Sequence, residues 1–166
     1  MSLHSVGIRR ADRADYAALI QLSAELLPKP HWYSQWRERL LVSDVFTYLA
    51  EDETIFGFVT AGPSLLLAAD VGEVCGLFLS SDHRGSGMGK KLLVRGLSVL
   101  KRRGFDCAVI FVNSVSSGSS GGAERDILTP MLEGLGFVAD VGERELNNKG
   151  VTIHQTGHSL NLRDYF

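Results

Sequence analysis

The sequence predicts one α/β domain over residues 1–166, with a mixed, largely antiparallel sheet. Apolar runs rich in β-branched and aromatic residues indicate strands, and longer stretches with apolar residues at helical spacing indicate helices. These elements follow the order β-α-α-β-β-β-α-β-α-β-β. The length suits a single domain with a substantial core, and the chain contains no internal repeat.

The N-terminal region reads as a strand followed by two helices. Residues 6–27, VGIRRADRADYAALIQLSAELL, open with a short strand and continue as a helix. Asp12 can cap this helix, with Asp15 three residues later in the pattern of a capping box. A second helix is expected over residues 31–41.

The middle of the chain predicts a hairpin, a third strand and a long helix. Residues 45–52 and 53–62 read as two strands joined by a tight acidic turn. Residues 72–80, GEVCGLFLS, form a further apolar strand that runs into a glycine-rich turn. The helix expected over residues 88–103 has a leucine stripe and basic residues at its C-terminus, where Gly104 ends it.

The C-terminal third begins with a nearly continuous apolar run, residues 105–113, which is suited to the middle of a sheet. The serine- and glycine-rich residues 114–124 read either as a loop over a site or as a neutral insertion. A short helix over residues 125–135 and a final antiparallel pair, residues 137–146 and 152–162, complete the domain.

Composition excludes several classes of protein. Seventeen Lys and Arg residues against 19 Asp and Glu give a formal charge of −2, unlike the basic footprint of a nucleic-acid-binding protein. No apolar run approaches the roughly 20 residues that span a bilayer, and the N-terminus lacks a secretory apolar core. Cys75 and Cys107 lie in apolar runs, as free thiols of a reduced, cytoplasmic protein do. We therefore expect a cytoplasmic protein without a nucleic-acid or membrane partner.

The glycine-rich turn in LSSDHRGSGMGKKLL, residues 79–93, resembles an anion site because it joins a strand to a helix N-terminus. The dinucleotide fingerprint G-x-G-x-x-G fails, because its third glycine would fall on Lys90 or Leu92. The nucleoside-triphosphate loop G-x-x-x-x-G-K-[ST] also fails, because Arg84 and Lys91 occupy its first and last positions.

A third anion-binding pattern fits these residues. The sequence RGSGMG at residues 84–89 matches Q/R-x-x-G-x-G/A and resembles the pyrophosphate loop of the GNAT superfamily of acyl-CoA-dependent N-acyltransferases. The surrounding LFLSSDHRGSGMGKKLL, the strand VIFVN and the helix end LEGLGF are similar to the core of that family. The resemblance implies a twisted sheet with helices on both faces and splayed central strands. It also implies acetyl-CoA as co-substrate and no metal.

The resemblance assigns two parts of the acetyl-CoA site. Pyrophosphate would bind the backbone amides of Arg84, Gly85, Ser86, Gly87, Met88, Gly89 and Lys90. Pantetheine would pair, like an extra strand, with the backbone of Leu77, Phe78 and Leu79, and the N–H of Leu79 would polarise the thioester carbonyl. For Lys90 and Lys91, a solvated helix face is the competing interpretation.

The resemblance also suggests catalytic and binding side chains. Glu73 lies eleven residues before Arg84, an offset like that of the glutamate base in protein-lysine acetyltransferases of the superfamily; an exposed strand-end carboxylate is the alternative. Asn113 resembles the family asparagine that bonds the CoA arm, and a strand-end cap competes with that role. One position departs from the pattern: Leu132 replaces the tyrosine that commonly protonates the leaving thiolate. Residues 114–120 and His154 are the substitute donors that we consider.

Recognition of the acceptor is the least determined part. Trp32, Tyr33 and Trp36 could line an acceptor pocket, although aromatic residues at this spacing also pack in cores. The expected function is transfer of acetyl to a primary amine: a small molecule, an amino acid or a protein lysine. The alternatives are a non-catalytic acyl-CoA-binding module, which Leu132 favours, and an enzyme using a longer acyl-CoA or a hydroxyl acceptor. The resemblance also allows a homodimer, since dimers are common for this fold.

Overall fold

A computed structural model describes residues 6–26, 44–64, 67–68, 70–113, 122–148 and 151–165. Within these residues, seven strands form one sheet in the order β1-β2-β3-β4-β5-β7-β6. The strands are β1 (Gly7–Arg10), β2 (Phe46–Glu51), β3 (Ile55–Pro63), β4 (Val71–Leu79), β5 (Cys107–Asn113), β6 (Val138–Asn148) and β7 (Val151–Asn161). Among the described strands, only β4 and β5 pair in parallel, so the expected mixed, largely antiparallel sheet is confirmed.

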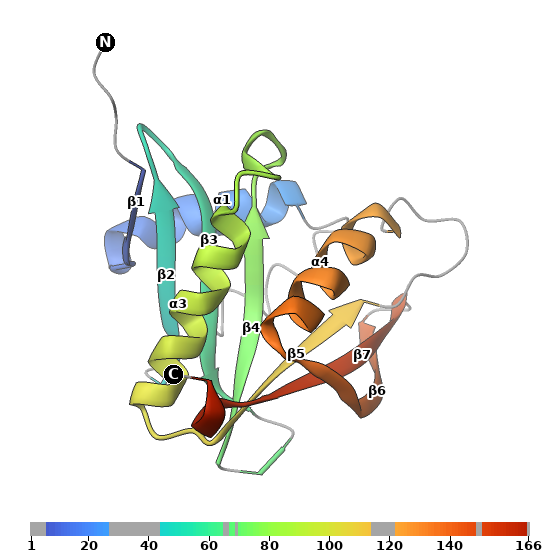
Figure 1. The fold of residues 1–166 in the computed structure, drawn as a ribbon. Helices are drawn as coiled ribbons and strands as arrows, with labels where there is room; N and C mark the ends of the chain where they lie inside the picture. The colour runs from blue at the N-terminus through green and yellow to red at the C-terminus, as the bar shows by residue number, and fades with distance from the viewer. Residues whose placement is uncertain are drawn as a thin grey trace.

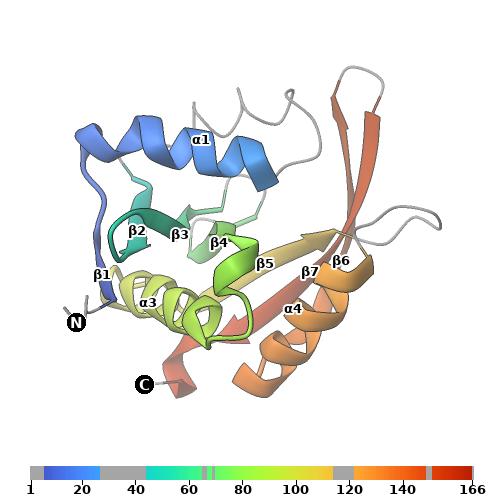
Figure 2. The same ribbon diagram turned by 90° about the horizontal axis from the view of Figure 1, so that it is seen from above.

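The helices are α1 (Tyr16–Leu26), α3 (Met88–Arg102) and α4 (Gly122–Leu135), with short helical turns at Arg13–Asp15, Ser81–His83 and Leu162–Asp164. Helix α1 covers one face of the sheet, whereas α3 and α4 lie on the other (Figure 1, Figure 2). None of the helices in the described part of the chain is long and apolar enough to cross a membrane.

Each face of the sheet has its own apolar core. The larger core joins α3 and α4 to the sheet and includes Leu92, Leu97 and Leu132, which solvent does not reach. The smaller core packs Leu19 of α1 against Phe58 of β3. Side chains along one strand alternate between the two faces. A strand residue that packs in one core therefore shows to which face its neighbours in the strand point.

Local signals in the sequence correctly located most element ends. Asp12 accepts a hydrogen bond from the N–H of Ala14, and the Asp15 carboxylate accepts one from the N–H of Asp12, both at 2.8 Å. Gly104 has a φ of 91° just after α3, a conformation that suits the residue following a helix. The helix expected over residues 31–41 lies outside the described residues.

Candidate functional site

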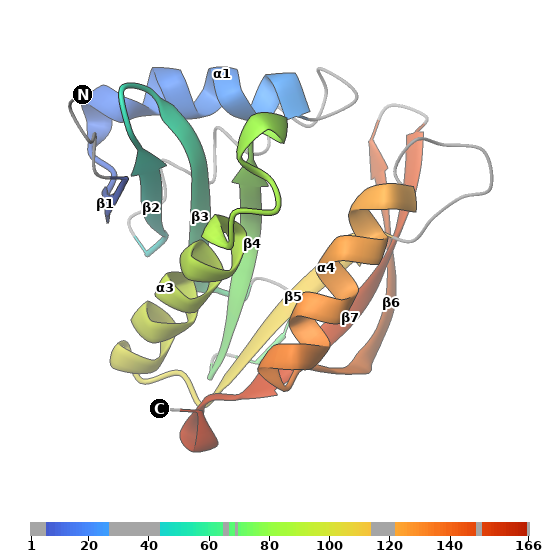
Figure 3. The ribbon, with the colours of Figure 1, turned by 45° about the horizontal axis from the view of Figure 1, so that its top comes forward.

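The central parallel strands pair only over their first halves. Residues Val71 to Val74 of β4 pair with Cys107 to Ile110 of β5, and within the described chain no later residue of either strand continues this ladder. Beyond that point, among the described strands, β4 pairs only with β3 and β5 pairs only with β7. Figure 3 shows the two strands diverging towards the end of β4 that leads into the glycine turn. The splayed central strands expected from the sequence are therefore confirmed.

Backbone groups of β4 face this opening at alternate residues. The N–H of Ser80 donates to the carbonyl of Phe56 at 2.8 Å, so Ser80 bonds towards β3. Along an antiparallel ladder, the backbone groups of successive residues point alternately towards the paired strand and away from it. The N–H and C=O groups of Phe78, two residues before Ser80, therefore also point towards β3. Leu77 and Leu79 then direct their N–H and C=O groups to the opening. Of the three residues expected to pair with an added strand, these two have the required direction.

A β-bulge lies where the ladder between β4 and β5 ends. Thr60 is opposite Gly76 and Ala61 is opposite Val74, which leaves Cys75 as the extra residue of β4. The Cys75 thiol donates to the backbone carbonyl of Glu73 at 3.5 Å. Bulges bend a strand and increase its twist, so this bulge explains why β4 turns away from β5 here.

The glycine turn follows β4 and leads into α3. Gly85 and Gly87 have φ angles of 78° and 81°, which side-chain-bearing residues adopt only with strain. A Cβ atom built at either glycine would meet nothing within 4 Å, so the outer side of the turn is open. The Arg84 side chain folds back and donates from Nε to the Leu79 carbonyl at 3.4 Å.

The first turn of α3 presents free backbone donors to this open side. The first helical bond runs from the Lys91 N–H to the Gly87 carbonyl at 3.2 Å. The N–H groups of Met88, Gly89 and Lys90 therefore precede the helical ladder and have no acceptor among the described residues. With the helix dipole, they form an anion-binding arrangement.

Contacts that the sequence did not reveal support the start of this turn. The His83 ring stacks on Phe56 with centroids 3.8 Å apart and an interplanar angle of 4°. Its Nδ1 atom lies 2.8 Å from the Ser80 hydroxyl, and its Nε2 atom lies 3.4 Å from the Asp52 carboxylate. Hydrogen bonds from the Thr54 N–H and from His83 lower the pKa of Asp52. The pairing of β2 and β3 thus helps to anchor the turn, and only tertiary contacts reveal it.

Glu73 is buried at the closed end of the opening. Its exposed fraction is 4%, and the hydroxyl of Ser64, a residue that is also buried, donates to its Oε2 atom at 3.3 Å. Val74 packs in the core beneath α3, so Glu73 points to the α1 face. An exposed strand-end carboxylate, the alternative interpretation, is wrong for this residue.

No hydroxyl occupies the position of the expected tyrosine. Leu132 of α4 is completely buried in the larger core. His154 is exposed and pairs with Glu145 at 3.3 Å, on the part of the β6–β7 hairpin beyond β5. By contrast, His158 is buried opposite Ile110, and its Nδ1 lies 3.3 Å from the Thr156 carbonyl.

Other expected site residues are described only in part. Asn113 is the last residue of β5 and pairs with Gln155 of β7. Trp32, Tyr33 and Trp36 lie outside the described residues, as do residues 114–120.

Comparison with known proteins points to one family. A family model described as the acetyltransferase (GNAT) family matches residues 11–118, which is more than half of the chain. No curated protein sequence matches the chain.

Solved structures share the whole fold at low sequence identity. The chain is similar to a GCN5-related N-acetyltransferase from Kribbella flavida, with a TM-score of 0.72 at 18% identity, covering 96% of this chain and 99% of that one. It is also similar to the ribosomal-protein-S18-alanine N-acetyltransferase from Escherichia coli, with a TM-score of 0.71, 14% identity and coverage of 95% and 94%. The Salmonella typhimurium protein yncA, solved with its cofactor acetyl-CoA, gives 0.69 at 18% identity, with coverage of 95% and 94%.

Proposed function

The chain belongs to the GNAT family of acetyltransferases, and on that premise we propose that it transfers acetyl from acetyl-CoA to a primary amine by direct attack. One observation carries the proposal: the ladder between β4 and β5 ends at Val74 and Ile110, and Leu77 and Leu79 direct backbone groups into the opening. An extended chain with amide groups, such as pantetheine, can pair with such an edge.

The residues of the glycine turn fit the pyrophosphate of this co-substrate. Gly85 and Gly87 let the backbone approach an anion closely, and the N–H groups of Met88, Gly89 and Lys90 are free to bind it. The side chain of Lys90 is exposed at the helix start and adds a positive charge. Asn113 is retained as a proposed contact to the CoA arm.

Spacing along β4 bears on which N–H polarises the thioester carbonyl. A strand rises about 3.3 Å per residue, so Glu73 and Leu79 are separated by roughly 20 Å of strand. The corresponding separation between Glu73 and Leu77 is roughly 13 Å. The base and the polarising N–H must act on the same reacting centre, and the shorter separation between Glu73 and Leu77 allows this more easily. We therefore propose Leu77 in place of Leu79 as the polarising donor.

Glu73 is the proposed general base. An alkylammonium has a pKa near ~10 and must lose a proton before its nitrogen can attack the thioester. Acetyl-CoA supplies the activated acetyl group. The Glu73 carboxylate, on the α1 face, would take the amine proton, and the N–H of Leu77 would stabilise the charge developing on the carbonyl oxygen. The new bond joins nitrogen to the acetyl carbon, and the carbon–sulfur bond breaks to release the CoA thiolate.

Leu132 favours a second candidate, a module that binds acyl-CoA without turnover. Thiol release from acetyl-CoA, measured over a panel of small amines, amino acids and lysine peptides, separates the two. We expect acceptor-dependent release with at least one class of amine. Tight binding of acetyl-CoA with no release on any acceptor would contradict transferase activity and support the binding module.

A further inference from the structure

His83, in the helical turn Ser81–His83 between β4 and the glycine turn, joins three segments of the chain. Its ring stacks on Phe56 of β3 with centroids 3.8 Å apart. Its Nδ1 atom lies 2.8 Å from the Ser80 hydroxyl, and its Nε2 atom lies 3.4 Å from the Asp52 carboxylate in the turn between β2 and β3. One ring therefore ties the end of the β2–β3 hairpin to the start of the proposed pyrophosphate site.

The contacts on both sides of His83 are held by further hydrogen bonds. On the hairpin side, the Thr54 N–H donates to Oδ1 of Asp52 at 3.0 Å. On the other side, the Ser86 hydroxyl donates to the backbone carbonyl of His83 at 2.5 Å. Ser86 lies between the two glycines of positive φ. The position of His83 therefore bears directly on the conformation of the glycine turn.

This arrangement accommodates both a neutral and a protonated ring. A neutral ring can donate from Nε2 to Asp52 while Nδ1 accepts from Ser80, and a protonated ring can donate to both, because a hydroxyl also accepts. The side chains of His83 and Asp52 are 33% and 31% exposed, so solvent protons reach the pair. Hydrogen bonds from the Thr54 N–H and from His83 lower the pKa of Asp52. The carboxylate is therefore ionised in the pH range in which histidine side chains change charge.

We propose that His83 is a positioning residue whose protonation strengthens binding of the CoA pyrophosphate at the glycine turn. This inference rests on the proposed acetyl-CoA site and concerns its regulation by pH. A protonated ring forms a charge-assisted pair with Asp52, which holds the start of the turn more firmly. It also adds a positive charge beside an anion site. Both effects favour the bound pyrophosphate.

Among the described residues, Asp52 is the carboxylate that pairs with the His83 ring. The charged neighbours of His83 in sequence point elsewhere or into solvent: Arg84 donates from Nε to the Leu79 carbonyl at 3.4 Å, and Asp82 is exposed. The contact from β3 is the uncharged ring of Phe56. Arginine and carboxylate side chains do not ordinarily change charge between pH 5.5 and 7.5. A change of affinity in that range therefore reports a histidine.

Calorimetric titration with 3′-dephospho-CoA tests the proposal without a requirement for turnover. This ligand keeps the pyrophosphate but lacks the phosphate monoester of CoA, whose second pKa near ~6 would obscure that of a histidine. The wild type should bind it about threefold more tightly at pH 5.5 than at pH 7.5, the size expected for a partly exposed charge. By linkage, binding at pH 6.5 should take up protons, which titrations in two buffers of different ionisation enthalpy measure.

Three variants assign the effect to this contact. His83→Gln keeps a polar side chain that cannot be protonated, so it should bind equally at both pH values and take up no protons. His154→Gln is the matched control, because His154 also pairs with a carboxylate, that of Glu145 at 3.3 Å, but on the β6–β7 hairpin; it should keep the threefold ratio. Asp52→Asn should reduce the ratio, since an amide carries no charge to pair with the protonated ring.

Each result supports or overturns the inference. Equal wild-type affinity at both pH values overturns it and leaves the pyrophosphate site standing. A ratio that persists in His83→Gln, disappears in His154→Gln or is unchanged in Asp52→Asn also overturns it.

Nuclear magnetic resonance of the wild type decides the case in which His83→Gln fails to fold or bind. The titration midpoint of the His83 ring should move to higher pH when the ligand is added, and an unchanged midpoint overturns the inference. Failure of the wild type to bind 3′-dephospho-CoA at any pH overturns it as well. Failure to bind CoA too overturns the proposed function together with this inference.

Discussion

The buried hydroxyl of Ser64 donates a hydrogen bond of 3.3 Å to the buried carboxylate of Glu73. Ser64 follows β3, and Glu73 lies near the start of β4, opposite Gly62 in the antiparallel ladder. A buried carboxylate requires polar partners to offset its lost hydration. This hydrogen bond therefore stabilises the Glu73 side chain at the point where β4 and β5 begin to diverge. The relationship gives Glu73 a defined position, as the proposed base requires.

Replacement of the proposed base should slow the reaction most at low pH. We expect Glu73→Gln to lower kcat about 100-fold at neutral pH, the usual contribution of a general base. The loss should shrink towards pH 10, where free alkylamine becomes abundant without a base. Rate profiles between pH 6 and 10 measure this. Ser64→Ala retains the carboxylate and should lose much less activity; an equal loss from both variants at every pH would contradict the assigned base.

A side chain at Gly87 should remove CoA binding while preserving the fold. The residue has a φ of 81°, and no atom lies within 4 Å of a Cβ built there. The conformational cost of Gly87→Val is therefore about 1–2 kcal/mol, and the side chain would occupy the space in front of the anion donors. Gly104→Val is the matched control, since Gly104 has a φ of 91° and equally open surroundings at the other end of α3. Calorimetry should detect acetyl-CoA binding to the Gly104 variant only. Binding to both variants would contradict the assignment of the glycine turn to the acetyl-CoA site.

Introduction of the missing tyrosine should not accelerate the reaction. Leu132 is fully enclosed in the larger core, so Leu132→Tyr overpacks it at a cost of about 1–3 kcal/mol. Leu132→Phe adds similar volume without a hydroxyl. The tyrosine and phenylalanine variants should show the same decrease in unfolding temperature and the same kcat. A higher kcat for the tyrosine variant than for the phenylalanine variant would show that protonation of the thiolate limits the wild type.

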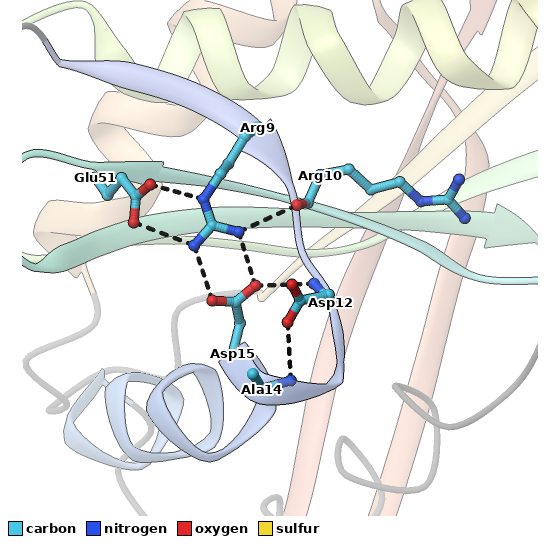
Figure 4. A network of polar contacts seen from close by, with 6 residues as sticks. All are labelled: Arg9, Arg10, Asp12, Ala14, Asp15 and Glu51. Carbon is cyan, nitrogen blue, oxygen red and sulfur yellow. Dashed lines mark hydrogen bonds and ion pairs between the residues drawn. The ribbon is translucent and has the colours of Figure 1, made fainter.

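An ion-pair network at the N-terminus should make stability depend on pH in the acid range. Arg9 bonds Asp15 and Glu51 through its guanidinium (Figure 4), at distances from 2.6 to 3.2 Å. Hydrogen bonds from Arg9 lower the pKa of Asp15 from 3.8 to about 2. The ionised carboxylate therefore stabilises the fold above pH 4, and this contribution is lost as pH falls from 4 to 2.

Asp15→Asn should accordingly reduce the free energy of unfolding by about 1 kcal/mol at pH 7, since solvent screens the partly exposed Arg9. The difference from the wild type should shrink as pH falls towards 2. Urea titrations at several pH values measure it. Asp44→Asn, at an exposed position with no described ion pair, should leave stability unchanged; a pH-independent effect at Asp15 would exclude the ion pair as its cause.

Local chemistry was sufficient for much of the fold. Apolar periodicity predicted α3 and the strands, because each pattern requires only neighbours within one element. The turn at residues 84–89 was equally readable, since positive φ angles favour glycine and a helix N-terminus presents donors whatever surrounds it. The capping of the first helix by Asp12 and Asp15 follows the same rule.

Tertiary contacts decided the rest of the candidate site. The sequence by itself determined that a strand, an anion-binding turn and a helix follow one another, because those features depend on residues close together in the chain. Only the folded sheet decided that pairing stops at Val74 and Ile110 and that Glu73 is buried against Ser64. Each of these pairs joins different elements, and register and packing between elements depend on the whole sheet rather than on any local pattern.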